Sequence, residues 1–318
     1  MLFFLFITIY LLSVFIHELT HYLMFRFQGV NVVVLKVFFL NITKGKFRLN
    51  INPIPFGYVI PSTQKISSVM KLSVLLKTIR DNLIITSLMQ VLQLIICLVI
   101  LIMIDTSSII GYSILMFIII NTLMLLGSID NSKGDLNLVR KYQKRDLRGF
   151  YAIICTSQIL EGFHSELIYR LMKKKWKLSQ SFHEFDMIVL NYIIEYEFRV
   201  RAIVSDELCS YLSNQVKTIN SNFLYLYYKT LIYYLAANGR LYSRYDGFNL
   251  NLYKRNKEII NAINTLIRLI IHKERINAFD IVLYRNINES ISSIKKRKEY
   301  LANTINDVIG GLNYEKED

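Results

Sequence analysis

The sequence predicts an all-α membrane protein with a small β-hairpin and an α-helical domain outside the membrane. Three observations predict this fold class. Of the 318 residues, 53% are hydrophobic, which is high for a soluble protein. Three segments, at about residues 2–27, 83–104 and 109–127, come close to the roughly 20 apolar residues that cross a bilayer. After residue 139 the apolar residues recur at helical spacing in shorter segments. We therefore expect a three-span core over residues 1–139 and a helical cytosolic domain over residues 140–318.

The segment between the first two spans predicts a short hairpin or small sheet at about residues 30–60. It is rich in β-branched and aromatic residues, has a Lys-Gly turn at 44–45, and ends near two prolines, Pro53 and Pro55. Residues 65–81 read as an amphipathic segment that leads into the second span. A link of about four residues, 105–108, makes the second and third spans antiparallel neighbours.

The C-terminal domain is expected to hold six to nine helices. Segments such as "SELIYRLMKKKW", "FDMIVLNYIIEYEF" and "KEIINAINTLIRLII" have apolar residues at helical spacing. No fixed period establishes a repeat architecture. The three cysteines are far apart and form no CxxC pair, which argues against a disulfide framework or a thiolate metal site.

The net charge of +14 is distributed unevenly and predicts the orientation in the membrane. Between residues 26 and 82 there are nine Lys or Arg and one acid, whereas the first residues and the 105–108 link carry no basic residue. The positive-inside rule then places the N-terminus outside and the C-terminal domain in the cytoplasm. We expect an integral protein of a bacterial cell membrane and no nucleic-acid partner. A cytosolic partner of the helical domain cannot be identified from the sequence.

Two basic clusters lie beyond the spans, "RKYQKRDLR" at 140–148 and "RLMKKKWK" at 170–177. Two interpretations stay open. They could rest on anionic lipid headgroups, or they could be ordinary solvated helix faces.

An H-E-x-x-H pattern stands in the last third of the first span, as His17-Glu18-Leu19-Thr20-His21. On a helix the two histidines stack one turn apart, so both rings can reach one Zn²⁺ while the Glu acts on the attacking water. Titratable groups inside a bilayer are costly and usually mark function. The pattern therefore predicts a zinc hydrolase with His17 and His21 as metal ligands and Glu18 as the general base.

Catalytic zinc takes three protein ligands, so a third must come from elsewhere. The other histidines fall in the predicted cytosolic domain. The third span ends near Gly127 and leads into "SIDNSKGDLNLVRKY", which offers Asp130 and Asp135 on the cytoplasmic side, at the depth of the HELTH segment. Both aspartates are candidates.

Three stretches over residues 1–142 resemble the site-2 protease family of intramembrane zinc metalloproteases. "HELTHYLMFRFQGVNV" resembles its HExxH segment and the following Gly. "PIPFGYV" resembles its Pro-x-Gly-Tyr-Val stretch, and "INTLMLLGSIDNSKGDL" stands in place of its Asn-x-x-Pro and Asp-Gly segment. The sequence departs from the family pattern at three points: Thr20 replaces a common Gly, Met124 replaces the Pro, and Gly134-Asp135 replaces Asp-Gly.

The resemblance implies Zn²⁺ as cofactor and Asp135 as the third ligand, with Asp130 as second choice. It also implies that Gly57 and Asn121 position the substrate, although Asn121 could equally bond one span to another. The implied activity is zinc endopeptidase cleavage of a membrane-embedded or membrane-associated peptide, such as a small signalling or bacteriocin-like precursor. A non-enzymatic membrane protein with a structural or degenerate zinc site and a partner-binding helical domain is the alternative. A proton-relaying transporter is a weaker one, because three spans without a repeat are few.

Overall fold

The computed structural model divides the chain into two compact units, residues 1–189 and 190–318. It describes residues 2–43, 46–49, 57–64, 66–104, 106, 108–162, 164–177, 184–216, 226, 229–230, 233–234, 268, 272, 274–281 and 291–314. The predicted division at residue 139, between a membrane core and a cytosolic domain, stays a prediction.

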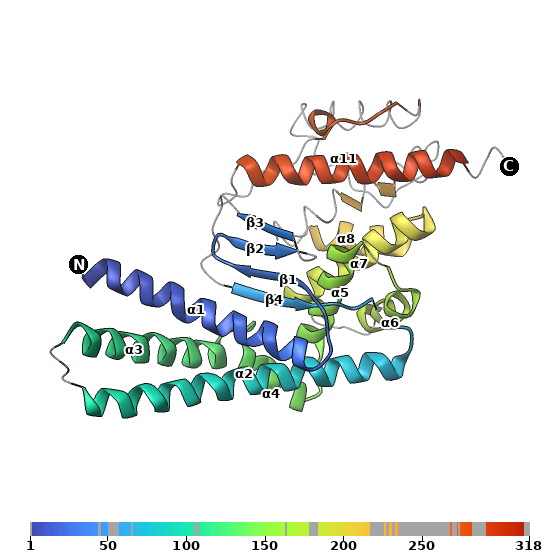
Figure 1. The fold of residues 1–318 in the computed structure, drawn as a ribbon. Helices are drawn as coiled ribbons and strands as arrows, with labels where there is room; N and C mark the ends of the chain where they lie inside the picture. Colours follow the sequence, from blue (N-terminus) through green and yellow to red (C-terminus); the bar gives the residue numbers. More distant parts are fainter. Residues whose placement is uncertain are drawn as a thin grey trace. The chain divides into compact units, whose positions relative to one another are not determined.

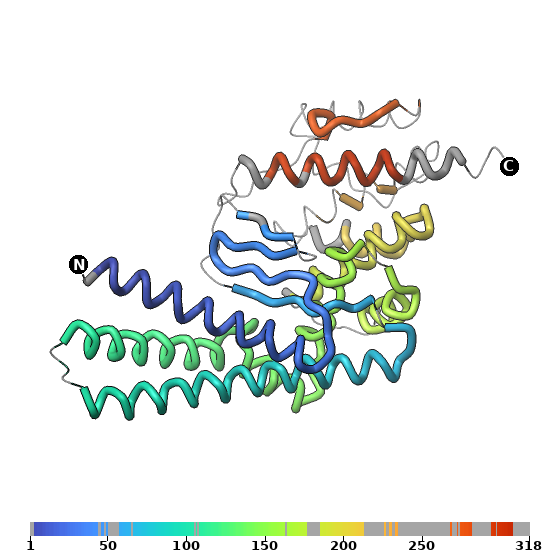
Figure 2. Tube along the Cα trace, in the orientation of Figure 1, coloured from blue at the N-terminus to red at the C-terminus, as the bar shows by residue number. Residues whose placement is uncertain are grey.

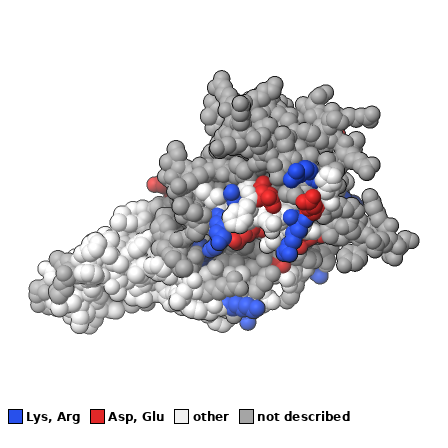
Figure 3. Space-filling model, turned by 90° about the horizontal axis from the view of Figure 1, so that it is seen from above, with Lys and Arg blue, Asp and Glu red and all other residues white. Residues whose placement is uncertain are grey.

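Three long helices form the membrane part of the first unit: α1 (Leu2–Phe27), α2 (Val69–Met103) and α3 (Ile109–Asp130). They pack side by side, with α2 antiparallel to both neighbours (Figure 1). Each is long and apolar enough to cross a bilayer. Large apolar side chains, for example Phe4, Ile95 and Leu123, point outward from them. In the view of Figure 3, the visible described surface at the end of this bundle carries no charged side chain. The three predicted spans are confirmed.

Helix α2 begins at Val69, well before the predicted start at residue 83. Its first turns extend beyond the ends of α1 and α3 (Figure 2). The predicted amphipathic lead-in is therefore part of the same helix, because no Gly or Pro interrupts residues 69–103. Ser68 caps the helix by accepting a hydrogen bond from Lys71 N at 3.3 Å.

The predicted hairpin is part of a four-stranded antiparallel sheet with the order β3-β2-β1-β4. Its strands are β1 (Val32–Val37), β2 (Leu40–Thr43), β3 (Lys46–Leu49) and β4 (Gly57–Pro61). One face packs on α1 through Val14, Leu35, Val37 and Phe38. Among the described strands, β4 stands at the edge of the sheet and pairs with β1 alone. The predicted turn at 44–45 and both prolines lie outside the described residues.

Four helices follow: α4 (Asp135–Gln143), α5 (Arg148–Glu161), α6 (Glu166–Lys177) and α7 (Glu184–Arg201). Helix α4 packs on α2 and α3, and α5 packs on β4. All three cysteines are free, as the sequence predicted. Helix α7 crosses the boundary between the two units.

The second unit contains the rest of α7, α8 (Asp206–Val216), the short 3₁₀-helix η3 (Ala278–Asp280) and α11 (Ile291–Tyr314). Its core buries Glu195 with two cations, Lys229 and Arg199, and Tyr233 donates to the same carboxylate at 3.0 Å. Burial alone would raise the pKa of Glu195, but the charges of Lys229 and Arg199 lower it to about 2. The rest of the six to nine predicted helices fall on residues outside the described ranges.

Candidate functional site

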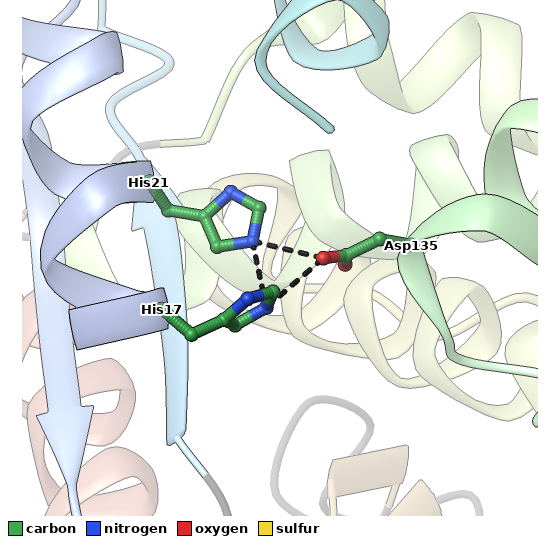
Figure 4. Close-up of side chains that lie close together, drawn as sticks. All are labelled: His17, His21 and Asp135. Atoms are coloured by element: carbon green, nitrogen blue, oxygen red, sulfur yellow. Dashed lines mark hydrogen bonds and ion pairs between the residues drawn. The ribbon is translucent and has the colours of Figure 1, made fainter. Parts of the chain in front are cut away.

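Helix α1 presents His17 and His21 on one face, one turn apart, as the HExxH spacing predicted. Their Nε2 atoms lie 3.3 Å from each other. Asp135 Oδ2, from the first residue of α4, lies 3.1 Å from His17 Nε2 and 3.0 Å from His21 Nε2. Figure 4 shows the two rings and the carboxylate pointing toward one another. These three side chains form a cluster that could hold a metal ion.

A tight turn between α3 and α4 brings Asp135 to the histidines. Its key residue is Gly134, where an added Cβ would lie only 2.3 Å from the backbone oxygen of Ser128. Glycine is therefore required immediately before Asp135, which gives a physical reason for the Gly-Asp order. Asp130 is the last residue of α3, exposed and outside the cluster. Of the two candidate aspartates, the structure brings Asp135 to the histidines.

The neighbouring span determines which nitrogen of His21 faces the cluster. Asn82 Nδ2 donates to the backbone oxygen of His21 at 3.0 Å, so the other amide atom, Oδ1, faces His21 Nδ1 at 2.6 Å. An acceptor there requires a proton on Nδ1. In the neutral imidazole, Nε2 then carries a lone pair and points it at Asp135 Oδ2. A lone pair and a carboxylate oxygen 3.0 Å apart repel each other unless a cation lies between them.

The donor set and its dimensions fit zinc. Two ligand atoms on a tetrahedral zinc, each bonded at roughly 2.05 Å, are separated by about 3.3 Å. The three distances in the cluster, 3.0, 3.1 and 3.3 Å, are close to that value. Two imidazoles and one carboxylate are also a donor set of catalytic zinc sites, which leave a fourth position open.

We expect Asn82→Leu to lower zinc affinity roughly tenfold to a hundredfold, because the Nδ1–H of His21 loses its acceptor. Thr86 Oγ1, at 3.1 Å from the same nitrogen, would replace it only in part. Competition with a chromophoric chelator measures the affinity. The matched control is Asn121→Leu, which also removes a buried amide between spans but does not touch the cluster. Equal loss in both variants would contradict the role of Asn82.

Glu18 is buried and its side chain packs directly on β4. A Cβ at Gly57 would lie 2.2 Å from Glu18 Cγ and 2.8 Å from Glu18 Oε1. Real Cβ atoms do not approach so closely, so any larger residue at position 57 must displace the glutamate. The absence of a side chain at Gly57 therefore determines where the Glu18 side chain can lie. The predicted role of Gly57 in positioning the substrate stays a prediction.

We expect Gly57→Ala to lower the rate of peptide cleavage by roughly one to two orders of magnitude, because a small displacement of a general base is costly. Zinc content should stay unchanged. The control is Gly127→Ala on α3, where an added Cβ meets nothing within 4 Å. Unchanged cleavage by Gly57→Ala would show that the position of Glu18 does not depend on this contact.

A cavity of about 260 Å³ opens beside the cluster. Glu18, His21 and Asp135 line it together with all five residues of β4. Most of the remaining lining is apolar and comes from α1, α2, α4, α5 and α7: Phe25, Ile79, Leu83, Leu138, Ala152, Ile153, Phe185 and Ile188. The edge of β4 therefore faces a mostly apolar space that also contains the glutamate.

A polar network fixes the end of β4 against α5. The carboxylate of Glu161, the last residue of α5, accepts from Ser62 Oγ, from Thr63 N at 3.1 Å, and from Thr63 Oγ1 at 2.9 Å. Ser157 Oγ donates to it at 3.2 Å. The strand edge that borders the cavity is thus held by side chains about a hundred residues further along the chain.

Asn121 is buried in the helix bundle. Its Nδ2 donates to Ser13 Oγ at 3.0 Å and to Phe117 O at 2.9 Å, while Gln90 Nε2 donates to its backbone oxygen at 3.2 Å. It therefore bonds the three spans together and does not line the cavity. A role in positioning substrate stays a prediction.

The comparisons with known proteins give one match. The family model of peptidase family M50 covers residues 5–313, well beyond the 142 residues of the resemblance in the sequence. No curated protein and no solved structure matches the chain. This family comprises zinc metalloproteases of the site-2 protease type. The chain therefore belongs to peptidase family M50, the site-2 protease family of membrane metalloproteases.

Proposed function

We propose that this protein is an active intramembrane zinc endopeptidase, with His17, His21 and Asp135 as metal ligands and Glu18 as general base. One observation carries the proposal. His21 and Asp135 of the metal-binding cluster, the glutamate and the edge strand β4 all line a single cavity, and His17 completes the cluster beside it.

The residues divide the chemistry among them. A zinc ion held by the cluster would supply Lewis-acid polarisation of the scissile carbonyl and of the attacking water. Glu18 accepts the proton of that water and passes it to the leaving amide nitrogen. Asn82 holds His21 in the tautomer that leaves Nε2 free for the metal. Gly57 leaves room for Glu18 to approach the reacting atoms.

The substrate binds in extended form, since a helix hides its carbonyl groups in internal hydrogen bonds. The edge of β4 supplies main-chain donors and acceptors for an added strand. The apolar lining from α2, α5 and α7 favours an apolar side chain next to the scissile bond. The network around Glu161 keeps this strand edge in place while the substrate pairs with it.

The physiological substrate is a membrane-embedded or membrane-associated peptide, and a small signalling or bacteriocin-like precursor suits the small three-span core. The excess of Lys and Arg over residues 26–82 supports an outside N-terminus and a cytoplasmic C-terminal domain in a bacterial membrane. Modification of single introduced cysteines from either side of the membrane tests this orientation.

The decisive experiment uses the full chain in lipid vesicles. It is incubated with two peptide sets, small precursor-like peptides and single-span regulator-like peptides, and the products are identified by mass spectrometry. We expect cleavage of an apolar-flanked bond that stops with a zinc chelator and returns when zinc is added. Zinc binding without cleavage in either set would favour the alternative, a non-enzymatic membrane protein with a structural metal site.

A further inference from the structure

Two basic segments that the zinc site does not use come together in space. Residues 140–148 and 170–177 contain ten Lys or Arg and a single acid. Both segments contribute to the lining of a second cavity of about 160 Å³, within the first unit. The first segment supplies Arg145 and Arg148, and the second supplies Lys175 and Trp176. Tyr151 from α5 also lines it.

The cations of this cavity are only partly neutralised. Asp146 accepts from Arg148 Nε at 3.0 Å and from Nη2 at 2.9 Å, and these hydrogen bonds lower the pKa of its carboxyl. Asp186 is the second acid in the lining and also interacts with Arg148. For Arg145 and Lys175 no ion pair is found among the described residues. The lining therefore has three cations, two acids and one positive charge in excess.

The backbone of Arg145 adds an independent observation. Its φ of 62° lies in the left-handed region, at the point where α4 ends. The turn is closed by hydrogen bonds from Arg145 N to Tyr142 O at 2.9 Å and from Asp146 N to Lys141 O at 2.9 Å. Glycine or asparagine adopts this conformation at lower cost. An arginine held there at a conformational cost indicates that its guanidinium is used.

The cavity has the size and chemistry for a phosphate group. An arginine fork and an ammonium bind phosphate oxygens with charge-assisted hydrogen bonds. Trp and Tyr are enriched where a membrane meets water. The lining begins at Arg145, directly after α4, the helix that follows the third span. We propose that Arg145 and Lys175 bind the phosphate of an anionic phospholipid headgroup, with Trp176 against the lipid. This proposal is independent of the peptidase activity.

The chain contains a single tryptophan, so Trp176 reports on this site without further engineering. The full chain is placed in nanodiscs that have a tryptophan-free scaffold protein and are made of phosphatidylcholine with increasing amounts of phosphatidylglycerol. In one series the acyl chains of the phosphatidylglycerol are brominated. In the other series the acyl chains of an equal amount of phosphatidylcholine are brominated instead. We expect brominated phosphatidylglycerol to quench Trp176 at a severalfold lower mole fraction than brominated phosphatidylcholine. Equal quenching by the two lipids would overturn the proposal.

Two pairs of charge variants distinguish lipid binding at this cavity from general electrostatic attraction of the protein to an anionic membrane surface. Arg145→Gln with Lys175→Gln should weaken the preference for the anionic lipid about tenfold, because the phosphate loses the charge-assisted hydrogen bonds of both side chains. The matched control is Lys144→Gln with Lys174→Gln, which removes the same charge from exposed neighbours that do not line the cavity. An equal loss in the control would contradict a defined site.

Two further measurements complete the test. Arg145→Gly removes the cation while relieving the backbone, so the lipid preference should fall without any loss of thermal stability. A preserved preference in this variant would overturn the role of Arg145.

Inorganic phosphate is then titrated into discs of phosphatidylcholine alone and into discs with phosphatidylglycerol. If it abolishes the quenching preference at low concentration, the ligand is a soluble phosphate and the lipid proposal fails.

Discussion

Replacing Glu18 by Gln should abolish peptide cleavage while leaving the zinc content at about one per chain. Gln has almost the same shape as Glu but cannot accept a proton from water at neutral pH. General-base catalysis contributes roughly a hundredfold to ten-thousandfold to the rate, so cleavage should fall by at least that order. The measurement is the single-turnover rate in vesicles, together with metal analysis of the same sample.

Glu18→Gln is expected to leave the fold undisturbed, and a control variant tests this. Glu18 is not in the metal-binding cluster and packs on Gly57 through its methylene groups, which Gln retains. Thermal unfolding should therefore stay near that of the parent chain. Glu166→Gln, on the partly exposed side chain that pairs with Arg170 on α6, serves as the control for the loss of one carboxylate. Full activity of Glu18→Gln would remove Glu18 from the mechanism and leave the peptidase proposal without a base.

The parts of the site that the sequence predicted are those set by local spacing. His17 and His21 share a helix face because they are four residues apart, and the spans follow from the length of apolar segments. The preference for Asp135 over Asp130 comes from the resemblance to the site-2 protease family. Its approach to the histidines depends on the contact between Gly134 and Ser128, which a sequence pattern does not contain.

The supporting residues could not be predicted, because their partners are distant in the chain. Asn82 lies 61 residues from His21 and in a segment close to the predicted start of the second span. It lies well inside α2, which begins at Val69, and its contact with His21 comes from the packing of α2 on α1. Glu161 and Ser62 are 99 residues apart. In the second unit, Glu195 and Lys229 stand in apolar helical patterns and are buried only because they pair.

Replacing Asp135 by Ala should remove zinc and activity together, whereas Asp130→Ala should retain both. The first variant leaves two imidazoles to hold the metal, fewer than the three protein ligands of catalytic zinc sites. Both aspartates lie close together in sequence and carry the same charge. The two variants therefore differ mainly in whether the carboxylate that is removed contacts His17 and His21. Metal analysis after dialysis against a weak chelator measures the outcome.

A loss of zinc in Asp135→Ala could also come from a loosened α4, since Asp135 is in the first turn of that helix and its charge favours the helix dipole. Two measurements separate these causes. Asp135→Asn keeps the shape of the side chain but is a poor zinc ligand, so it should lose the metal as well. Zinc at a hundredfold excess over its dissociation constant should stabilise the parent chain by about 2.7 kcal/mol, and neither variant should respond at that concentration. Zinc-dependent stabilisation that survived both substitutions would place the third ligand outside Asp135, and the proposed arrangement between α1 and α4 would have to be abandoned.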